Sequence, residues 1–481
     1  MMPTRTPVEG QLYIGGKWRG QELDKIKVYN PATGELVGEV PKAGAKETAE
    51  AIEAAHQAFE SWSSLTAHER SAYLEQYYQQ IMVHKEELAR LITLEMGKPQ
   101  PEAQGEVVYA ADFIKWFAEE GKRIYGRTIP SHLPHKRMQV WKQPVGVVAA
   151  ITPWNFPAAM LTRKLGPALA AGCTMVIKPS GETPLTAVKL MELAEKSDIP
   201  AGVLNLVTGP SSVIAQEIMT NPKVRKVTFT GSTEVGKKLI EQSAGQVKKL
   251  SLELGGHAPI IVLDDADLDQ AVDGVIASKF RNTGQTCVCA NRIYVQAGIY
   301  DTFVERLAEK TKQLKVGNGF ETGVQIGPLI NREAYEKVEK HVQDAVAKGA
   351  QVVAGGFGFT REKAYFYQPT VLRDVHHGML VMKEETFGPV APVQKVDTEE
   401  EAVQLANDTP YGLAAYLFTQ NVARGIKVAE KLDYGIVGWN DGVPSAVQAP
   451  FGGMKESGMG REGGYEGIEA FLETKYVAIG L

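Results

Sequence analysis

The chain contains little of what several protein classes require. It has three cysteines in 481 residues, too few for a disulfide framework, so we expect a reducing, cytoplasmic compartment. The N-terminal stretch MMPTRTPVEG lacks the apolar segment of a signal peptide, and no apolar run reaches the roughly 20 residues of a membrane helix. The net charge of -5 argues against a nucleic-acid partner. No His/Cys cluster has zinc spacing, so no metal is expected.

Hydrophobic periodicity divides the rest of the chain into two α/β units. Residues 45–121 have the spacing of amphipathic helices, and Gly97 with Pro99 behind it predicts a helix end. From residue 138, short apolar runs alternate with helical patterns, which is typical of a parallel sheet covered on both faces. The runs lie at residues 145–151, 174–177, 203–207, 224–229 and 260–263. The alternation resumes after residue 290, so a second α/β unit follows.

Two strand-like segments lie outside both units, near residues 124–144 and in the last 25 or so residues. An exposed strand edge must be paired or covered, so these segments suggest an arm that joins subunits into a homodimer or homotetramer. The alternative is that both segments pack on their own subunit.

Three short segments contain residues that could be chemically active, and each alone is ambiguous. Cys287 lies in a loop of small and polar residues, but a cysteine is a nucleophile only as thiolate, so an incidental cysteine is the commoner explanation. Glu253 lies between two leucines before a double glycine; if buried, it could accept a proton near neutral pH, and surface exposure is equally compatible. Asn155, in a turn stiffened by proline, could donate to an oxyanion or belong to a plain loop.

The segment GSTEVGKK at residues 231–238 follows an apolar run. It matches a phosphate-loop NTPase motif except at Lys238, where a hydroxyl should bind magnesium, so an NTPase is not favoured. A glycine turn before a helix can still hold a phosphate group. Dinucleotide binding and an ordinary strand-to-helix turn both remain open for this segment alone.

Five motifs occur in order along the chain: WNFP at 154–157, ELGG at 253–256, GQTC at 284–287, ETFGP at 385–389 and PFGG at 450–453. This set resembles the aldehyde dehydrogenase superfamily, and the resemblance covers essentially the whole chain. It implies two Rossmann-like α/β domains, one cofactor-binding and one catalytic, plus a small β oligomerisation arm. The expected domains are residues 1–122 and 145–255 for dinucleotide binding, 256–452 for catalysis, and 123–144 with 453–481 for the arm.

The resemblance also implies roles for individual residues. Cys287 matches the thiolate that attacks the aldehyde to form a thiohemiacetal, from which a hydride passes to the nicotinamide and leaves a thioester. Asn155 and the backbone amide of Cys287 match the oxyanion hole, and Glu253 matches the base that activates water for deacylation. The implied cofactor-binding residues are Trp154, Lys178, Ser180, Gly231, Ser232, Leu254, Glu385 and Phe387. A thiol hydrolase or esterase using Cys287 and Glu253 is the alternative class, and an inactive relative is a further one.

One departure from the family pattern concerns the cofactor. Many NAD-preferring relatives carry Glu three residues after the lysine that matches Lys178, and here that position is Gly181, with Glu182 displaced by one. Without that carboxylate, Lys178 and Ser180 could bind a 2′-phosphate. We therefore expect NADP or NAD to be accepted, with NADP somewhat favoured.

Two arginines narrow the expected substrate. Arg163 follows the Asn155 turn, and Arg281 precedes Cys287 by six residues. Guanidinium groups near one nucleophile suggest an aldehyde with an anionic far end, to which Ser445 could add a hydroxyl. This trio is similar to the succinate-semialdehyde dehydrogenase branch. Glutarate semialdehyde, one carbon longer, remains an alternative, as does an arginine that pairs with a neighbouring acid.

Cys289 lies two residues from Cys287, and two interpretations are open. A bridge between them would be strained and easily reduced, and it would cap the nucleophile as an oxidation switch. The alternative is a small apolar packing role.

Overall fold

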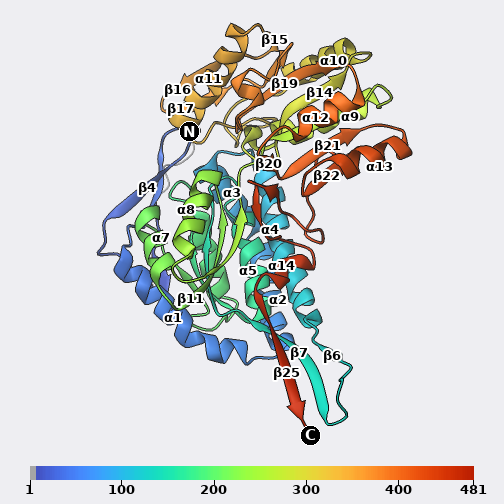
Figure 1. The fold of residues 1–481 in the computed structure, drawn as a ribbon. Helices are drawn as coiled ribbons and strands as arrows, with labels where there is room; N and C mark the ends of the chain where they lie inside the picture. The colour runs from blue at the N-terminus through green and yellow to red at the C-terminus, as the bar shows by residue number, and fades with distance from the viewer. Residues whose placement is uncertain (1–6) are drawn as a thin grey trace.

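The computed structural model describes residues 7–481. The N-terminal stretch for which no signal peptide is expected therefore lies partly, in its first six residues, outside the described part. Figure 1 shows two α/β bodies, one above the other in this view, and a β arm that extends from the lower body and ends near the C-terminus. The α/β fold expected from the alternating pattern is confirmed.

The lower body is built on an eight-stranded sheet with the order β24-β12-β11-β8-β9-β10-β2-β3. The strands are β2 Leu12–Ile14, β3 Lys17–Arg19, β8 Val147–Ile151, β9 Thr174–Lys178, β10 Leu204–Leu206, β11 Val224–Thr230, β12 Lys249–Glu253 and β24 Gly458–Met459. Strands β8 to β12 are parallel, and numbered along the chain they lie in the order 3-2-1-4-5, which matches the first five strands of a Rossmann fold. Such a sheet binds ligands at the carboxyl ends of its strands, near the switch point between β8 and β11.

Helices cover both faces of this sheet, which explains why β8 and β9 are buried at every position and lack alternation. The helices are α1 Ala45–Ser63, α2 Ala67–Val83, α3 Lys85–Met96, α4 Gln100–Glu120, α5 Ala159–Ala171, α6 Leu185–Glu195, α7 Ser211–Thr220 and α8 Thr233–Ser243. The first four occupy the region predicted to be helical, and α3 ends at Gly97, which has the left-handed φ of 90°.

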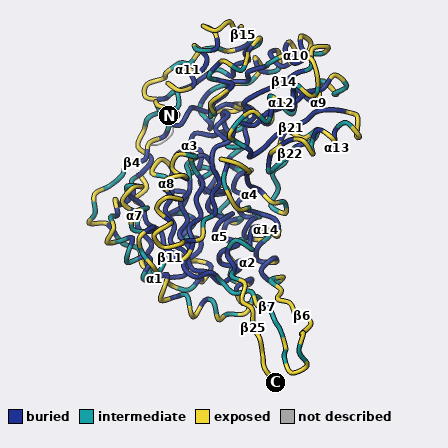
Figure 2. The backbone as a smooth tube through the Cα atoms, in the orientation of Figure 1, coloured by how far each residue is buried: buried dark blue, intermediate teal, exposed yellow. Residues whose placement is uncertain are grey.

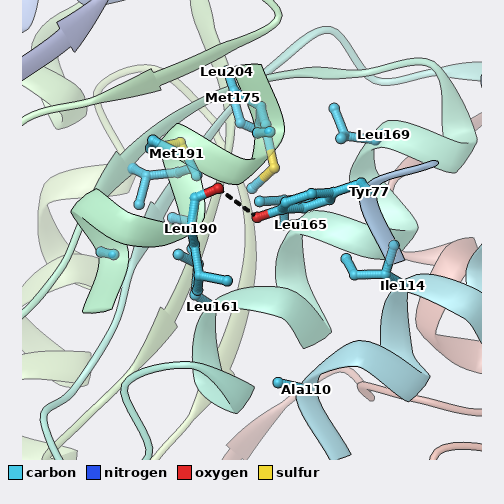
Figure 3. Close-up of a cluster of buried hydrophobic side chains, with 14 of the residues drawn as sticks. Tyr77, Ala110, Ile114, Leu161, Leu165, Leu169, Met175, Leu190, Met191 and Leu204 are labelled. Carbon is cyan, nitrogen blue, oxygen red and sulfur yellow. Dashed lines mark hydrogen bonds between the residues drawn. The ribbon is translucent and has the colours of Figure 1, made fainter. Parts of the chain in front are cut away.

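The helical layer packs tightly around α4. Figure 3 shows Tyr77 of α2 among apolar side chains of α4, α5 and α6, with Ile114 of α4 nearby. The Tyr77 hydroxyl donates to the carbonyl of Leu190 at 3.0 Å, so the one polar group of this side chain is satisfied inside the core. One face of helix α4 is therefore buried in the core of the lower body.

The upper body is built on a seven-stranded sheet with the order β15-β18-β19-β14-β13-β21-β22, parallel except for the β15–β18 pair. The strands are β13 Ala258–Val262, β14 Ala290–Gln296, β15 Gln351–Ala354, β18 Thr370–Arg373, β19 Val390–Val396, β21 Ala414–Phe418 and β22 Ile436–Trp439. The helices are α9 Leu268–Phe280, α10 Tyr300–Lys312, α11 Arg332–Ala347, α12 Glu399–Asn407 and α13 Val422–Lys431. The predicted second α/β unit is thus present.

Short elements complete the chain. They are β1 Val8–Glu9, β4 Lys25–Tyr29, β5 Leu36–Pro41, β16 Gly358–Arg361, β17 Ala364–Tyr367, β20 Tyr411–Gly412, β23 Met454–Lys455, α14 Glu466–Glu469 and the 3-10 turns Gly121–Arg123, Arg281–Gly284 and Leu380–Met382.

The arm is a three-stranded antiparallel sheet of β6 Arg127–Ile129, β7 Lys136–Pro144 and β25 Leu472–Gly480. Figure 2 shows it as mostly exposed or half-buried, in contrast to the two cores. The predicted strands outside both main sheets therefore exist. Within the expected arm segment 453–481, however, β24 pairs with β12 in the lower sheet, and only β25 pairs with β7.

Candidate active site

The predicted nucleophile lies in a constrained loop between α9 and β14. Asn282 and Thr283 have φ values of 52° and 59°, a region that residues with side chains seldom adopt. The buried side chain of Gln285 holds the loop, because its amide donates to the Asn282 and Pro328 carbonyls at 3.3 Å each and its oxygen accepts from Ile330. The loop leaves Cys287 half-buried and in contact with a cavity.

Asn155 lies against this loop, as the resemblance implies for an oxyanion donor. Its side-chain amide donates to the carbonyl of Gln285 at 3.0 Å, so one amide hydrogen is engaged and the second remains available. The position follows from the fold, because Asn155 comes directly after β8 at the carboxyl edge of the lower sheet.

The thiol of Cys287 lies among groups that shift its pKa. Burial raises its pKa to about 12, while Arg163 pulls it down and the carboxyl groups of Glu385 and Glu253 push it up. A thiolate attack therefore requires a group that removes the proton as the sulfur reacts.

Glu253, at the end of β12, is buried rather than exposed, the first of the two alternatives that its sequence context allowed. Its Oε2 atom has no hydrogen-bond partner among the described residues. Burial and the nearby Glu462 carboxylate raise the pKa of Glu253 well above its usual range. This side chain therefore holds a proton more readily than an exposed glutamate does.

Sequence reasoning missed Glu462. This carboxylate is buried and forms ion pairs with Arg163 and Lys164, and Lys164 also donates to the Thr230 hydroxyl at 2.6 Å. The two cations outweigh burial and lower the pKa of Glu462. A sequence feature could have identified Glu462, because a double glycine follows it, as one follows Glu253.

A cavity of about 340 Å³ brings the predicted substrate residues together with the nucleophile. Arg163, Arg281 and Ser445 all line it, and so does Cys287. The remaining lining residues are Glu102, Gly105, Glu106, Tyr109, Phe156, Ala159, Met160, Thr286, Val288 and Phe451. Residues far apart in sequence thus form one chamber around the thiol.

The two arginines differ in how their charges are used. Arg163 pairs with Glu462 and lies over the Phe451 ring at 3.9 Å, so the alternative of a neighbouring acid applies to it. Arg281 is half-buried over the Phe156 ring at 5.5 Å and has no ion-pair partner in the described part of the chain. Arg281 is therefore the arginine whose charge remains available to a ligand.

The predicted cofactor residues lie mainly at the carboxyl edge of the lower sheet. Lys178 ends β9 and donates to the Ser211 hydroxyl at 2.6 Å; burial lowers the pKa of Lys178 to about 8. Ser211, the first residue of α7, was not foreseen from the sequence. Ser180 is half-buried beside Lys178, whereas the displaced Glu182 accepts from the Asn331 amide at 3.3 Å.

The strand-to-helix turn after β11 contains two of the predicted cofactor residues. Ser232 is exposed and caps α8, its hydroxyl accepting from Val235 at 3.3 Å, with Gly231 just before it. Leu254 packs beneath this helix, because a Cβ on Gly236 would lie 2.5 Å from it.

Residues of both bodies are in contact where the resemblance implies that the nicotinamide end of the cofactor binds. Phe387 and Trp154 pack edge to face with ring centroids 5.6 Å apart. Glu385 accepts from the Gly256 amide at 3.2 Å, and burial raises its pKa to about 7. The two bodies thus meet at this part of the site.

Cys289 is fully buried and its thiol lies 3.4 Å from the Lys279 carbonyl. All three cysteines are free. Within residues 7–481, no three or more His, Cys, Asp or Glu side chains gather in a way that could hold a metal ion. No helix in that range has the length and apolar character that a bilayer crossing demands.

Comparison with known proteins agrees with this geometry. The model of the aldehyde dehydrogenase family matches residues 18–477. The succinate-semialdehyde dehydrogenase [NADP(+)] of Escherichia coli is 56% identical over 472 residues, 98% of each chain. The glutarate-semialdehyde dehydrogenase of Pseudomonas putida is 56% identical over 470 residues, 98% of this chain and 97% of the relative. A crystal structure of an NADP-dependent enzyme from E. coli superposes with a TM-score of 0.96 at 56% identity, covering 98% of each chain. This protein belongs to the aldehyde dehydrogenase family.

Proposed function

We propose that this protein oxidises succinic semialdehyde to succinate with a nicotinamide cofactor. The observation that carries the proposal is one cavity that contains both Cys287 and Arg281, an arginine without an acid partner in the described chain. An aldehyde with a carboxylate at its far end matches both groups. By their names, both relatives described above act on such semialdehyde acids.

In the proposed acylation, the Cys287 sulfur bonds to the aldehyde carbon and the carbonyl oxygen becomes an oxyanion. The free amide hydrogen of Asn155 and the backbone N–H of Cys287 stabilise this oxyanion, each donor contributing about 3–4 kcal/mol. Because burial raises the pKa of the thiol, we assign removal of its proton to the Glu253 carboxylate, whose Oε2 has no hydrogen-bond partner among the described residues. The product is a thiohemiacetal on Cys287.

The residues at the carboxyl edge of the lower sheet fit a dinucleotide. The first N–H groups of α8 lack helical partners, and they begin beside the exposed Ser232, which suits a pyrophosphate. Lys178, Ser180 and Ser211 would hold the adenosine ribose, and Glu385 with Phe387 the nicotinamide side. When bound, the cofactor accepts the hydride that leaves the thiohemiacetal.

We propose that NADP is favoured over NAD. The Lys178 ammonium has no acid partner in residues 7–481, and together with the Ser180 and Ser211 hydroxyl groups it suits a 2′-phosphate. The Glu182 carboxylate accepts a hydrogen bond from the Asn331 side chain, so in this structure it does not point to the proposed ribose site. The name of the E. coli relative also gives NADP(+).

Deacylation returns the enzyme to its starting state. Glu253 first releases to solvent the proton that it took from the thiol. Water then attacks the thioester, Glu253 accepts the water proton, and that proton passes to the departing sulfur of Cys287. The raised pKa of Glu253 makes it a stronger base than an exposed glutamate, which suits both proton transfers. The charges of Arg163, Glu462 and Lys164 act on Glu253: the Glu462 carboxylate raises its pKa, and the two cations lower it.

Glutarate semialdehyde is the second candidate substrate. One methylene changes binding by only about 1–3 kcal/mol, and the relative named for that substrate is as similar to this chain as the first. A thiol hydrolase is the alternative class; it would need Cys287 and Glu253 but no cofactor.

The test is kcat/KM for succinic semialdehyde, glutaric semialdehyde and an uncharged aldehyde, each with NAD and with NADP. We expect the succinic compound with NADP to give the highest value. Faster turnover of the uncharged aldehyde would refute the anionic substrate, and ester cleavage without any aldehyde oxidation would support the hydrolase.

The exposed β arm, formed by β6, β7 and β25, supports a dimer or tetramer. A chain ending before β25 should elute as a smaller species on size exclusion, because β7 loses its antiparallel partner. We propose a cytoplasmic compartment, since Cys287 must stay reduced to act.

A further inference from the structure

Helix α4 approaches both loops that contain the reacting groups. Two of its carboxylates, Glu102 and Glu106, stand one helical turn apart and line the cavity around Cys287. Neither takes part in the proposed reaction, and carboxylates are unexpected in a chamber for an anionic aldehyde. Their hydrogen bonds explain their presence.

Glu106 holds the turn that contains Asn155. Its Oε1 accepts from the backbone N–H groups of Ala158 and Ala159, at 2.9 and 3.3 Å, where α5 begins. Its Oε2 pairs with Lys98 at 2.5 Å, and Lys98 donates to the Asn155 carbonyl at 2.9 Å. Neither side chain of the pair is exposed. The buried ion pair therefore makes hydrogen bonds to both ends of this turn, at Asn155 and at Ala158 and Ala159.

Glu102 holds the loop that leads to Cys287. Its Oε2 accepts from the backbone N–H of Asn282 at 2.8 Å, at the first of the two left-handed residues. Such a backbone persists only where surrounding contacts hold it. The Asn282 side chain donates to the Asn155 carbonyl at 3.0 Å, so the two loops also touch directly.

We propose that Glu102, Glu106 and Lys98 are positioning residues that set the distance from the Cys287 sulfur to the Asn155 amide. One turn of a packed helix is a stiff spacer, and it ties the two loops together. A misplacement of about 1 Å can cost a reaction on the order of 100-fold. The proposal rests on the proposed function only in taking Cys287 as nucleophile and Asn155 as oxyanion donor.

Two reactions of Cys287 separate positioning from folding. Alkylation by iodoacetamide needs the thiol but no oxyanion donor, whereas acylation by 4-nitrophenyl acetate needs both and no cofactor. The informative variant is Lys98→Met with Glu106→Gln, because an uncharged pair avoids leaving one buried charge alone. We expect acylation to slow by about 10- to 100-fold, with alkylation, followed by mass spectrometry, changed by less than about threefold.

Glu102 provides the matched comparison. Glu102→Ala should slow both alkylation and acylation, because the nucleophile loop itself is released. Glu102→Gln should restore both, since an amide oxygen still accepts from Asn282. The proposal is overturned if the double variant acylates at the parental rate, if its alkylation falls in parallel with acylation, or if Glu102→Gln behaves like Glu102→Ala. Absence of semialdehyde oxidation in the parent would remove the proposed function and leave these comparisons intact.

Discussion

Replacing Arg281 with Met should separate anionic from uncharged aldehydes. A guanidinium and a carboxylate about 4 Å apart attract by about 4 kcal/mol at an effective dielectric constant of 20. Desolvation reduces the net value of a charge-assisted hydrogen bond to about 2–3 kcal/mol. At 1.36 kcal/mol per tenfold, we expect kcat/KM for succinic semialdehyde to fall about 30- to 150-fold. The value for an uncharged aldehyde should change by less than about threefold.

Arg163→Met is the matched control, since both arginines line the same cavity. Arg163 is paired with Glu462, so its removal perturbs the cluster that faces Glu253. We expect losses of similar size for both aldehydes, because deacylation is common to them. Steady-state assays of reduced cofactor at 340 nm measure all four values. Equal losses for both aldehydes in Arg281→Met would refute the assignment of Arg281 as the carboxylate clamp.

Three further predictions concern the base, the cofactor and the second cysteine. Only a deprotonated Glu253 can accept a proton, so kcat should fall as the pH drops through the raised pKa of Glu253, above the range of an exposed glutamate. Glu253→Gln should abolish this limb and lower kcat by about 10²–10⁴-fold, and an unchanged pH profile would exclude Glu253 as base. Ser180→Glu should lower kcat/KM with NADP by at least about tenfold and spare NAD, since a carboxylate would repel a 2′-phosphate; equal losses would contradict the assigned phosphate site. A Cys287–Cys289 bridge predicts peroxide inactivation that dithiothreitol reverses in the parent but not in Cys289→Ala, whereas identical behaviour of the two would assign Cys289 to packing alone.

Much of the fold could be predicted because its signals are local. Parallel strands buried on both faces must be continuous apolar runs, and the runs at 145–151 and 174–177 became β8 and β9. Gly97 ends a helix because only a residue without Cβ adopts its backbone conformation at little cost. The motif residues follow strands, so knowing the strands already locates Asn155, Lys178 and Ser232 at one sheet edge.

Other features of the site could not be predicted because they depend on pairs far apart in the chain. Arg163 and Glu462 are separated by almost 300 positions, and only their contact shows that one of the two arginines is already neutralised. The same holds for Ser211 beside Lys178 and for Glu106 beneath the Asn155 turn. No periodicity or spacing encodes which acid reaches which base.

The sequence by itself predicted the order of strands and helices, since this depends on residue type and near neighbours. Its resemblance to a known family implied the kind of chemistry and the candidate reacting groups. The tertiary structure decided which charges are free, which are paired, and how far burial moves each pKa. Those properties follow from the low-dielectric surroundings that the assembled domains create around Cys287 and Glu253, and an extended chain does not have them.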